Sequence, residues 1–324
     1  MRSLRQSSML IAGIALALPA AALERSDVVR RELSFAPGGE RLVVIDNVMG
    51  GVEVRAGQAD RVTVEIRRTV TARREGELTR GFDEVVLAVE GWSGGVALYQ
   101  DGPFRCRERR SSREARDDGE AHDDGGSVRD AGRSIGRSVG RAIGRSWGEP
   151  RRDWSGDCRW DPDYELDWQW LVTVPADVDL EVTTVNEGTV EVSGVRGRVR
   201  AGNVNGPLRL AGLAGEVRAA TVNGGIVVEY AVAPAADASF ESVNGSIEIA
   251  FPIGTSADVE METMNGELWS DFEVTAAPRR PEPTATRRGG NRFRLEHDTV
   301  VRLGAGGPRF ECTTLNGDIV LRER

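Results

Sequence analysis

The sequence predicts an all-β fold, a single-stranded parallel β-helix or solenoid with coils of about 20 residues. The first observation behind this prediction is a recurring motif, in which a small polar residue and an apolar residue precede Asn-Gly. The asparagines at positions 186, 205, 223, 244 and 265 are spaced by 19, 18, 21 and 21 residues, and a fixed period of this size is typical of stacked repeats. The second observation is that apolar residues keep the same step around each motif.

The apolar pattern predicts strands on both sides of each Asn-Gly pair. Counting from the Asn, positions −6, −4 and −1 are apolar, and so are most residues two and four positions after the Gly. Alternation by two is typical of a strand with one face on a core. In an Asn-Gly hairpin, position −1 would share a face with positions −3 and −5, which are mostly polar, as at Arg218 and Glu241. The apolar position −1 therefore favours a corner that reverses the pleat, and an antiparallel β-sandwich of Asn-Gly hairpins is the alternative fold.

The Asn-Gly pairs are expected to be structural corners. Gly tolerates a positive φ and Asn is the next most tolerant residue, so the pair suits a tight turn. Asparagines stacked in register could bond to one another as a ladder of amides; the alternative is a row of amides presented to a sugar. The predicted corner ladder consists of Asn186, Asn205, Asn223, Asn244, Asn265, Asn316, Gly206, Gly224, Gly245, Gly266 and Gly317.

Two consecutive segments resemble the bacterial putative-adhesin family. They are Leu171-Val-Thr-Val-Pro-Ala-Asp-Val-Asp-Leu180 and Glu181-Val-Thr-Thr-Val-Asn-Glu-Gly-Thr-Val-Glu-Val-Ser-Gly194. The resemblance spans residues 33–324 except for two inserts. It implies an exported β-helical protein built from Val-Asn-Gly coils, adhesin-like in function and without catalytic residues to carry over. The chain departs from the family pattern at Met49, at Asn186-Glu187-Gly188 and in a long charged insert.

The N-terminus predicts export. Arg2 and Arg5 precede the apolar run Met9–Leu18, and small residues follow it, so residues 1–22 are expected to be a signal peptide cut after Ala22. The apolar run is too short to span a bilayer. We therefore expect a periplasmic or secreted protein that is not an integral membrane protein.

Composition and the pattern of apolar residues predict how the rest of the chain is divided into β regions and loops. The formal net charge of −9 argues against nucleic-acid binding, which needs a basic surface. Residues 28–100 have β-type patterns throughout, so residues 23–104 are expected to form the first coils or a cap on them. The predicted solenoid repeats occupy residues 153–275, a Pro- and Arg-rich loop residues 276–292, and the final coils residues 293–324.

Residues 105–152 form a charged insert whose composition predicts disorder, because it has too few apolar residues to bury. Within it, a four-residue repeat would place an apolar stripe beside an arginine stripe if residues 127–148 became helical. Such a helix could fold on an anionic membrane surface or an acidic partner; alternatively, the segment is a low-complexity expansion without a role, or lies on the acidic solenoid. The two stripes consist of Arg133, Arg137, Arg141, Arg145, Ile135, Val139, Ile143 and Trp147.

The cysteines and tryptophans supply the remaining candidate sites. Cys106 and Cys158 flank the insert and are predicted to pair in an oxidising compartment, whereas Cys312 occupies a core position and is predicted to be a buried free thiol. Five of the seven tryptophans lie in residues 147–170, interleaved with acids. They form either a ligand platform, as in many sugar-binding proteins, or packing that caps the solenoid. The candidate platform residues are Trp154, Trp160, Tyr164, Asp161 and Asp163.

The sequence contains no recognisable catalytic, cofactor or metal site. Its two His residues match neither the spacing of a zinc site nor a Ser-His-Asp set. We therefore expect a non-catalytic exported β-solenoid, an adhesin-like interaction or cell-envelope scaffold protein whose partner is a cell-envelope protein or polysaccharide. The alternatives are a carbohydrate-active enzyme (polysaccharide lyase or hydrolase) on the same fold and peripheral binding to anionic membranes through the Arg tetrads. The outward strand residues expected to form any binding face are Arg198, Arg200, Arg209, Arg218, Glu248, Glu260 and Glu262.

Overall fold

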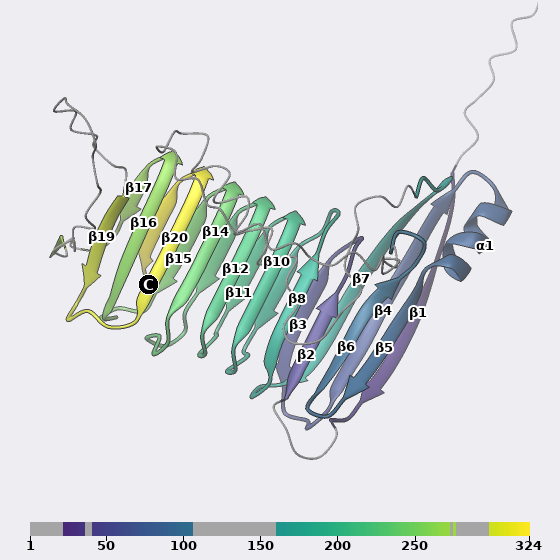
Figure 1. Cartoon of the computed structure of the whole chain (residues 1–324), viewed down its shortest axis with the longest axis horizontal. Helices are drawn as coiled ribbons and strands as arrows, with labels where there is room; N and C mark the ends of the chain where they lie inside the picture. Colours follow the sequence, from purple (N-terminus) through teal and green to yellow (C-terminus); the bar gives the residue numbers. More distant parts are fainter. Residues whose placement is uncertain (1–21, 36–40, 106–159, 273–274, 277–297) are drawn as a thin grey trace, which may run out of the picture.

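The computed structural model describes residues 22–35, 41–105, 160–272, 275–276 and 298–324. These residues form two large β-sheets, named sheet A and sheet B below, and one short helix, α1 (Glu75–Glu84). The strands lie side by side along the long axis of the molecule, and α1 lies at one end of it (Figure 1). The predicted all-β class is therefore confirmed.

Sheet A contains ten strands in the order β1-β4-β7-β3-β9-β11-β13-β15-β21-β17. In that order, the strands are Leu23–Leu33, Val62–Ala72, Tyr164–Pro175, Val52–Gly57, Val190–Ser193, Leu208–Ala211, Ile226–Glu229, Ile247–Phe251, Ile319–Glu323 and Leu268–Ser270.

Sheet B contains eleven strands in the order β18-β19-β16-β20-β14-β12-β10-β8-β2-β6-β5. In that order, the strands are Thr275–Ala276, Asp298–Leu303, Ala257–Asn265, Arg309–Asn316, Ala238–Asn244, Val217–Asn223, Val199–Asn205, Asp179–Thr184, Leu42–Asp46, Gly95–Asp101 and Val86–Trp92.

Each sequence repeat gives one strand to sheet B and the next to sheet A, with the Asn-Gly pair between them. In sheet B, β10, β12 and β14 pair in parallel, so that Val199, Val217 and Ala238 are neighbours. In sheet A, β11, β13 and β15 pair in parallel, with Leu208 beside Ile226. Equal positions of successive repeats therefore lie next to one another. The strands that flank these Asn-Gly pairs belong to different sheets, so they do not form the hairpins of the alternative prediction.

The last repeat in the sequence does not lie at the end of the row. Its strands β20 and β21 lie between β14/β15 and β16/β17, although β16 and β17 precede them in the chain. The register is kept, because Phe310 pairs with Ala238 on one side and with Val259 on the other. β19 pairs antiparallel with the far edge of β16. Strands β19 and β20 thus hold β16 between them.

The N-terminal region contains a helix that the sequence analysis assigned to β-structure. The Glu77 carboxylate accepts a hydrogen bond from the backbone N–H of Arg74 (3.1 Å) at the start of α1. Leu78 and Phe82 lie four positions apart and pack together on β4 and β7. The prediction that residues 28–100 are β throughout is therefore wrong at α1, because a single amphipathic helix of 10 residues, about three turns, is too short to stand out from the alternating strands around it.

The core lies between the two sheets. In the repeat that contains Asn223, the inward positions −6, −4 and −2 are Val217, Ala219 and Thr221, and all three are buried. Alternation continues to the next residue, so Val222 at position −1 faces outward, where it packs with Ala220 apart from the main core. The expected reversal of the pleat before position −1 is therefore wrong. The small polar residue of the motif, and not the apolar one, points into the core.

Candidate functional site

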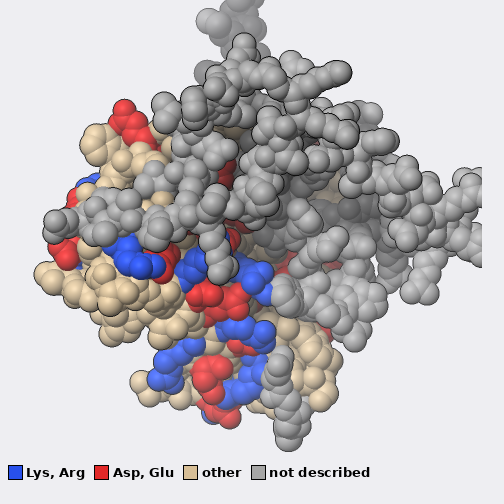
Figure 2. Space-filling model, turned by 60° about the vertical axis from the view of Figure 1, so that its left-hand side comes forward, with Lys and Arg blue, Asp and Glu red and all other residues tan. Residues whose placement is uncertain are grey.

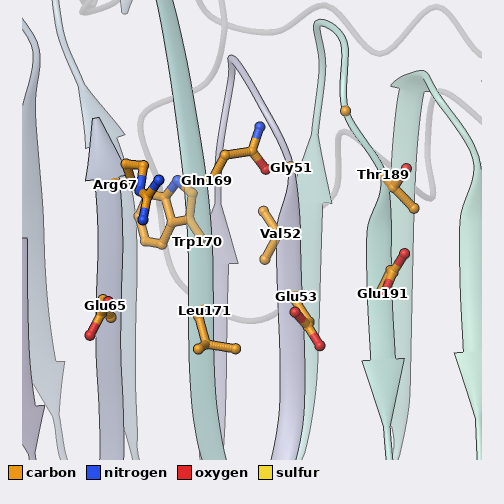
Figure 3. Close-up of a pocket in the computed structure, with 11 residues that line it drawn as sticks. Gly51, Val52, Glu53, Glu65, Arg67, Gln169, Trp170, Leu171, Thr189 and Glu191 are labelled. Atoms are coloured by element: carbon orange, nitrogen blue, oxygen red, sulfur yellow. The ribbon is translucent and has the colours of Figure 1, made fainter. Parts of the chain in front are cut away.

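A groove crosses the outer face of sheet A over β4, β7, β3 and β9 (Figure 3). Its volume is about 500 Å³. The strands that form it come from three separate parts of the chain, and only the folded sheet brings them together. The lining residues are Gly51, Val52, Glu53, Glu65, Arg67, Gln169, Trp170, Leu171, Gly188, Thr189 and Glu191.

Strand register places four of these residues in one row across the groove. Glu65 pairs with Leu171, Leu171 with Glu53, and Glu53 with Glu191. The Leu171 side chain points outward and is 37% exposed. The row therefore presents one apolar side chain among three carboxylates.

A second row lies one step along the same strands and supplies donors. Arg67 is the cross-strand neighbour of Gln169. Gly51 lies beside them without a side chain, and a Cβ at this position would come within 2.8 Å of the Gln169 side-chain oxygen and 3.3 Å of the Thr189 backbone oxygen. The absence of a side chain at Gly51 therefore leaves this part of the groove open.

The charges of the groove are balanced by arginines. Glu65 lies 2.8 Å from Arg30, Glu191 lies 3.2 Å from Arg209, and Glu53 contacts Arg55. Exposed pairs of this kind contribute little to stability. The arginines do offset the negative charge of the three carboxylates. The groove therefore offers hydrogen-bonding groups without selecting for a highly charged ligand.

Five of the predicted outward residues form ion pairs of this kind, one of them with Glu191 of the groove. The pairs are Arg198 with Asp179 (2.5 Å), Arg209 with Glu191 (3.2 Å), Arg218 with Glu216 (2.8 Å), Glu260 with Arg309 (2.6 Å) and Glu248 with Arg322 (3.3 Å). On the side of the molecule seen in Figure 2, basic and acidic side chains are interleaved in the same way.

The predicted corner asparagines lie in one exposed row. Apart from Asn186, which accepts at the end of the row, each side-chain amide donates to the side-chain oxygen of the Asn in the neighbouring repeat, so all the donors point the same way. The bonds run from Asn205 to Asn186 (3.5 Å), Asn223 to Asn205 (2.9 Å), Asn244 to Asn223 (2.9 Å), Asn316 to Asn244 (2.8 Å) and Asn265 to Asn316 (2.9 Å). Because an amide both donates and accepts, Asn can occupy every place in such a chain.

A second row of hydrogen bonds, which the sequence analysis missed, lies inside the corners. The small polar residue two positions before each Asn is buried and donates to the backbone carbonyl of a Gly in the neighbouring repeat. The bonds run from Asn203 to Gly188 (3.0 Å), Thr221 to Gly206 (3.0 Å), Ser242 to Gly224 (3.0 Å), Thr314 to Gly245 (2.9 Å) and Thr263 to Gly317 (2.9 Å). The signal was present in the sequence, because every residue at position −2 of the motif is Asn, Thr or Ser.

Replacing Thr221 by valine tests the inner row. The substitution Thr221→Val keeps the shape of the side chain but removes the donor to the Gly206 carbonyl, so we expect the free energy of unfolding to fall by about 1–3 kcal/mol. Urea denaturation measures the loss. Thr63→Val, on the exposed face of β4, is the control and is expected to change stability by less than about 0.5 kcal/mol. Equal losses in the two variants would contradict a role for the buried hydroxyl.

The corner glycines are present for a different reason than the one predicted. Gly206, Gly224 and Gly245 do not have a positive φ. Instead, a Cβ on Gly224 would overlap the backbone oxygen of Gly206, and a Cβ on Gly245 would overlap that of Gly224. Glycine is therefore required because the backbones of neighbouring corners touch.

The aromatic residues proposed as a ligand platform make packing contacts where the structure describes them. Trp160 packs edge-on against Phe104, with ring centroids 5.3 Å apart, and against Tyr164 at 5.9 Å. Tyr164 is buried and its hydroxyl donates to Glu84 (2.7 Å); burial, and then this bond to a carboxylate, raises the pKa of Tyr164. Of the other candidates, Asp161 and Asp163 are exposed, and Trp154 lies outside the described residues.

Several predictions fall outside the described ranges. These are the signal peptide, almost all of the charged insert and of the Pro- and Arg-rich loop, Cys106, Cys158, and the stripe residues Arg133, Arg137, Arg141, Arg145, Ile135, Val139, Ile143 and Trp147. Cys312 lies within them as a free thiol that is 1% exposed, and burial raises its pKa.

The described part of the chain has neither a membrane-spanning helix nor a cluster of metal-ligating side chains. It contains no helix that is long and apolar enough to cross a membrane. In the same residues, no three side chains of His, Cys, Asp or Glu come together in a group that could hold a metal ion.

No protein-family model and no curated protein sequence matches this chain. Among solved structures, a putative cell adhesion protein from Clostridium sporogenes is similar over 94% of this chain and 100% of its own, with 9% identity and a TM-score of 0.39. A putative adhesin from Bacteroides fragilis is similar over 92% and 97%, with 7% identity and a TM-score of 0.34. A putative lipid binding protein from Parabacteroides distasonis is similar over 91% and 96%, with 10% identity and a TM-score of 0.21. At these values the likeness establishes neither the fold nor the function of this chain.

Proposed function

We propose that this chain is a non-catalytic, exported interaction protein, an adhesin-like or cell-envelope scaffold, and that the groove on sheet A is its binding face. The observation that carries this proposal is the groove of about 500 Å³ on the outer face of four strands. Its acceptors and donors surround one apolar side chain, and its carboxylates are paired with arginines. Such a surface suits an extended, uncharged and hydroxyl-rich chain, and a cell-envelope polysaccharide has this chemistry.

The lining residues would make different contacts with the bound chain. Leu171, exposed at the centre of the row, would pack against the apolar face of a sugar ring. The oxygens of Glu53, Glu65 and Glu191 would accept hydrogen bonds from hydroxyl groups, while Arg67 would donate them. Because the groove runs across parallel and antiparallel strands of one sheet, its residues are held at fixed spacing, which lowers the entropy cost of binding.

The frame behind the groove is, in this proposal, a parallel β-solenoid with an antiparallel N-terminal extension. The parallel pairing of equal positions supports it, and so do the two rows of corner hydrogen bonds. An experimental structure tests it: Asn205, Asn223 and Asn244 are expected in adjacent corners. A structure in which the chain turned back on itself at these residues would contradict it.

Binding to envelope polysaccharides tests the proposed function. We expect the wild-type protein to bind a polysaccharide fraction in calorimetry, and we expect Leu171→Arg to raise the Kd at least about tenfold, because it places a charge and a long side chain at the centre of the groove. Val227→Arg is the matched control, since Val227 is also 37% exposed on the outer face of sheet A but lies outside the groove. The control is expected to leave the Kd unchanged.

The same experiment separates this function from its alternatives. Equal weakening by Leu171→Arg and Val227→Arg would contradict the groove as the binding face. Release of new reducing or unsaturated ends from the polysaccharide by the wild-type protein would contradict a non-catalytic role and favour a hydrolase or lyase. Recovery of the protein from the cytoplasmic fraction of its host cells, uncut, would contradict export.

A further inference from the structure

Each sheet has two edge strands, and three of these four strands are protected against pairing with another chain. Sheet A ends at β1 and β17, and sheet B ends at β18 and β5. β17 and β18 are only three and two residues long, and six of the eleven residues of β1 are charged. Short strands and charged side chains are ordinary ways in which proteins prevent an edge from pairing. β5 has seven residues, of which only Glu90 is charged, so it lacks both protections.

The outer edge of β5 is long, apolar and exposed. β5 pairs antiparallel with β6 along its whole length, from Val86 to Trp92, and no described strand pairs with its other edge. The side chains of Val86 and Val89 are 43% and 38% exposed. The carboxylate of Glu90 accepts a hydrogen bond from the Tyr99 hydroxyl on β6 and is thus held away from this edge. The edge therefore presents backbone N–H and C=O groups beside apolar side chains, which is a template for strand pairing.

Sheet A extends one strand further than sheet B at this end of the molecule. β2 and β3 follow one another in the chain, β6 and β7 continue the two sheets beside them, and β5 and β4 come next. The guanidinium group of Arg68 on β4 donates to the backbone carbonyl of Val85 (3.3 Å), directly before β5, so β4 lies opposite β5. β1 pairs with the outer edge of β4 and has no counterpart among the described strands of sheet B. Both β1 and β5 lie at the end that carries α1 (Figure 1). The position beside β5 and opposite β1 is named the open position below.

The inner face of β1 forms an apolar wall of the open position. Val29 and Leu33 are half-buried and pack against the main core, and their cross-strand neighbours on β4 are buried. On β5, Val89 is the cross-strand neighbour of the buried Leu98, so it also faces inward, although it is 38% exposed. A strand at the open position would cover the exposed parts of these three side chains.

One positive charge on this wall has no acidic partner in the described part of the chain. Arg31 lies between the two apolar residues of β1 and is the cross-strand neighbour of the buried Val64. Its side chain is exposed, and its guanidinium group donates to the backbone carbonyl of Arg30 (2.8 Å). Arg30, on the outer face, is instead paired with Glu65. Facing sheets lie about 10 Å apart, a distance that an arginine and a glutamate side chain can span together, so a carboxylate on an added strand could pair with Arg31.

We propose that β5 accepts an added β-strand at the open position, an extended segment of a partner protein that alternates apolar with polar residues and carries a carboxylate facing Arg31. Backbone hydrogen bonds to the edge of β5 would hold the segment, and its apolar residues would pack between Val89 and the inner face of β1. A second copy of this chain does not fit in the same way. If two β5 strands paired, the β1 strand of each copy would overlap β4 of the other, whereas a single strand avoids this overlap.

Titration of the full chain with a fluorescent synthetic peptide, Ser-Val-Thr-Val-Glu-Val-Thr, tests the strand addition. We expect saturable binding in fluorescence anisotropy, and at least about tenfold slower hydrogen exchange of the amides of Val86–Trp92 in the complex. Val89→Arg puts a charge and a long side chain into the open position and is expected to raise the Kd at least about tenfold. Val28→Arg is the matched control, because Val28 is 43% exposed but lies on the outer face of β1; it is expected to leave the Kd unchanged. Thermal melting shows whether both variants are folded.

The backbone and the charge of the peptide are tested separately. A peptide methylated at its backbone nitrogens keeps its side chains but cannot donate to β5, and it is expected not to bind. Replacing the glutamate of the peptide by lysine is expected to raise the Kd about fivefold for the wild type, and Arg31→Glu is expected to reverse this preference.

Four results would overturn the strand addition. These are no saturable binding of the peptide, equal binding of the methylated peptide, equal Kd values in Val89→Arg and Val28→Arg, and a preference for glutamate that Arg31→Glu leaves unchanged. A dimer of the wild-type protein in sedimentation that Val89→Arg dissociates would also overturn it, in favour of pairing between two copies of this chain.

Discussion

Replacing Gly224 by alanine is expected to lower the free energy of unfolding by about 3 kcal/mol, because the new Cβ has no room in the row of corners. It would overlap the backbone oxygen of Gly206 and lie 2.9 Å from the backbone nitrogen of Pro207. Backbone atoms cannot rotate aside as a side chain can. The Gly224 N–H also donates to the Asn244 carbonyl (3.0 Å), so the corner cannot move away without breaking the next contact. Guanidinium denaturation measures the loss.

Gly91→Ala is the control for this substitution. Gly91 lies in β5, it does not have a positive φ, and a Cβ on it would meet nothing within 4 Å. We expect a change of less than about 0.5 kcal/mol there. A loss at Gly224 no larger than the loss at Gly91 would show that neighbouring corners are not in backbone contact.

The strands of the repeats could be predicted from the sequence because their signal is local. Leu208 and Leu210 flank Arg209, Val217 and Ala219 flank Arg218, and all four apolar residues are buried between the sheets. Alternation by two depends only on which face of a strand meets the core. The same alternation predicted that Cys312 lies in the core, and in the structure its side chain is 1% exposed.

At the corner, the same alternation rule did not predict which residue is buried. Apolar residues were assumed to face inward, but at the motif Thr221 is inside and Val222 is outside. The carbonyl groups of the neighbouring corner lie inside and need a donor, which Thr221 supplies and a valine would not. The identity of the buried residue is therefore set by an adjacent repeat, and a pattern within one repeat does not report it.

Neither the spatial order of the repeats nor the position of the groove could be predicted, for a related reason. All repeats present the same pairing positions, so periodicity does not say that β20 lies between β14 and β16. The groove lies outside the motif: Glu65, Leu171 and Glu191 meet only because β4, β7, β3 and β9 are neighbours in sheet A. Gly50-Gly51 was the local sign of an unusual site, and its meaning depended on the distant residues Gln169 and Thr189.

Replacing Phe310 by alanine is expected to produce the largest loss of stability, about 4 kcal/mol. Phe310 is fully buried at the start of β20. Its ring centroid lies 5.1 Å from that of Phe251, 5.7 Å from that of Tyr230 and 6.5 Å from that of Phe240. These neighbours come from three other strands and loops and cannot all collapse into the space that the ring leaves. Thermal and denaturant unfolding measure the loss.

Trp269→Ala is the control, because it removes a larger aromatic side chain that is 55% exposed on β17. The comparison also tests the inserted position of the last repeat. A terminal repeat would be packed on one side only and could peel away at small cost, whereas β20 is paired with β14 on one side and β16 on the other. Losing Phe310 should therefore also reduce the protection of β16 amides from hydrogen exchange, since β16 is anchored to the rest of sheet B through β20. Unchanged protection of β16 in Phe310→Ala would mean that the last repeat does not link its two neighbours.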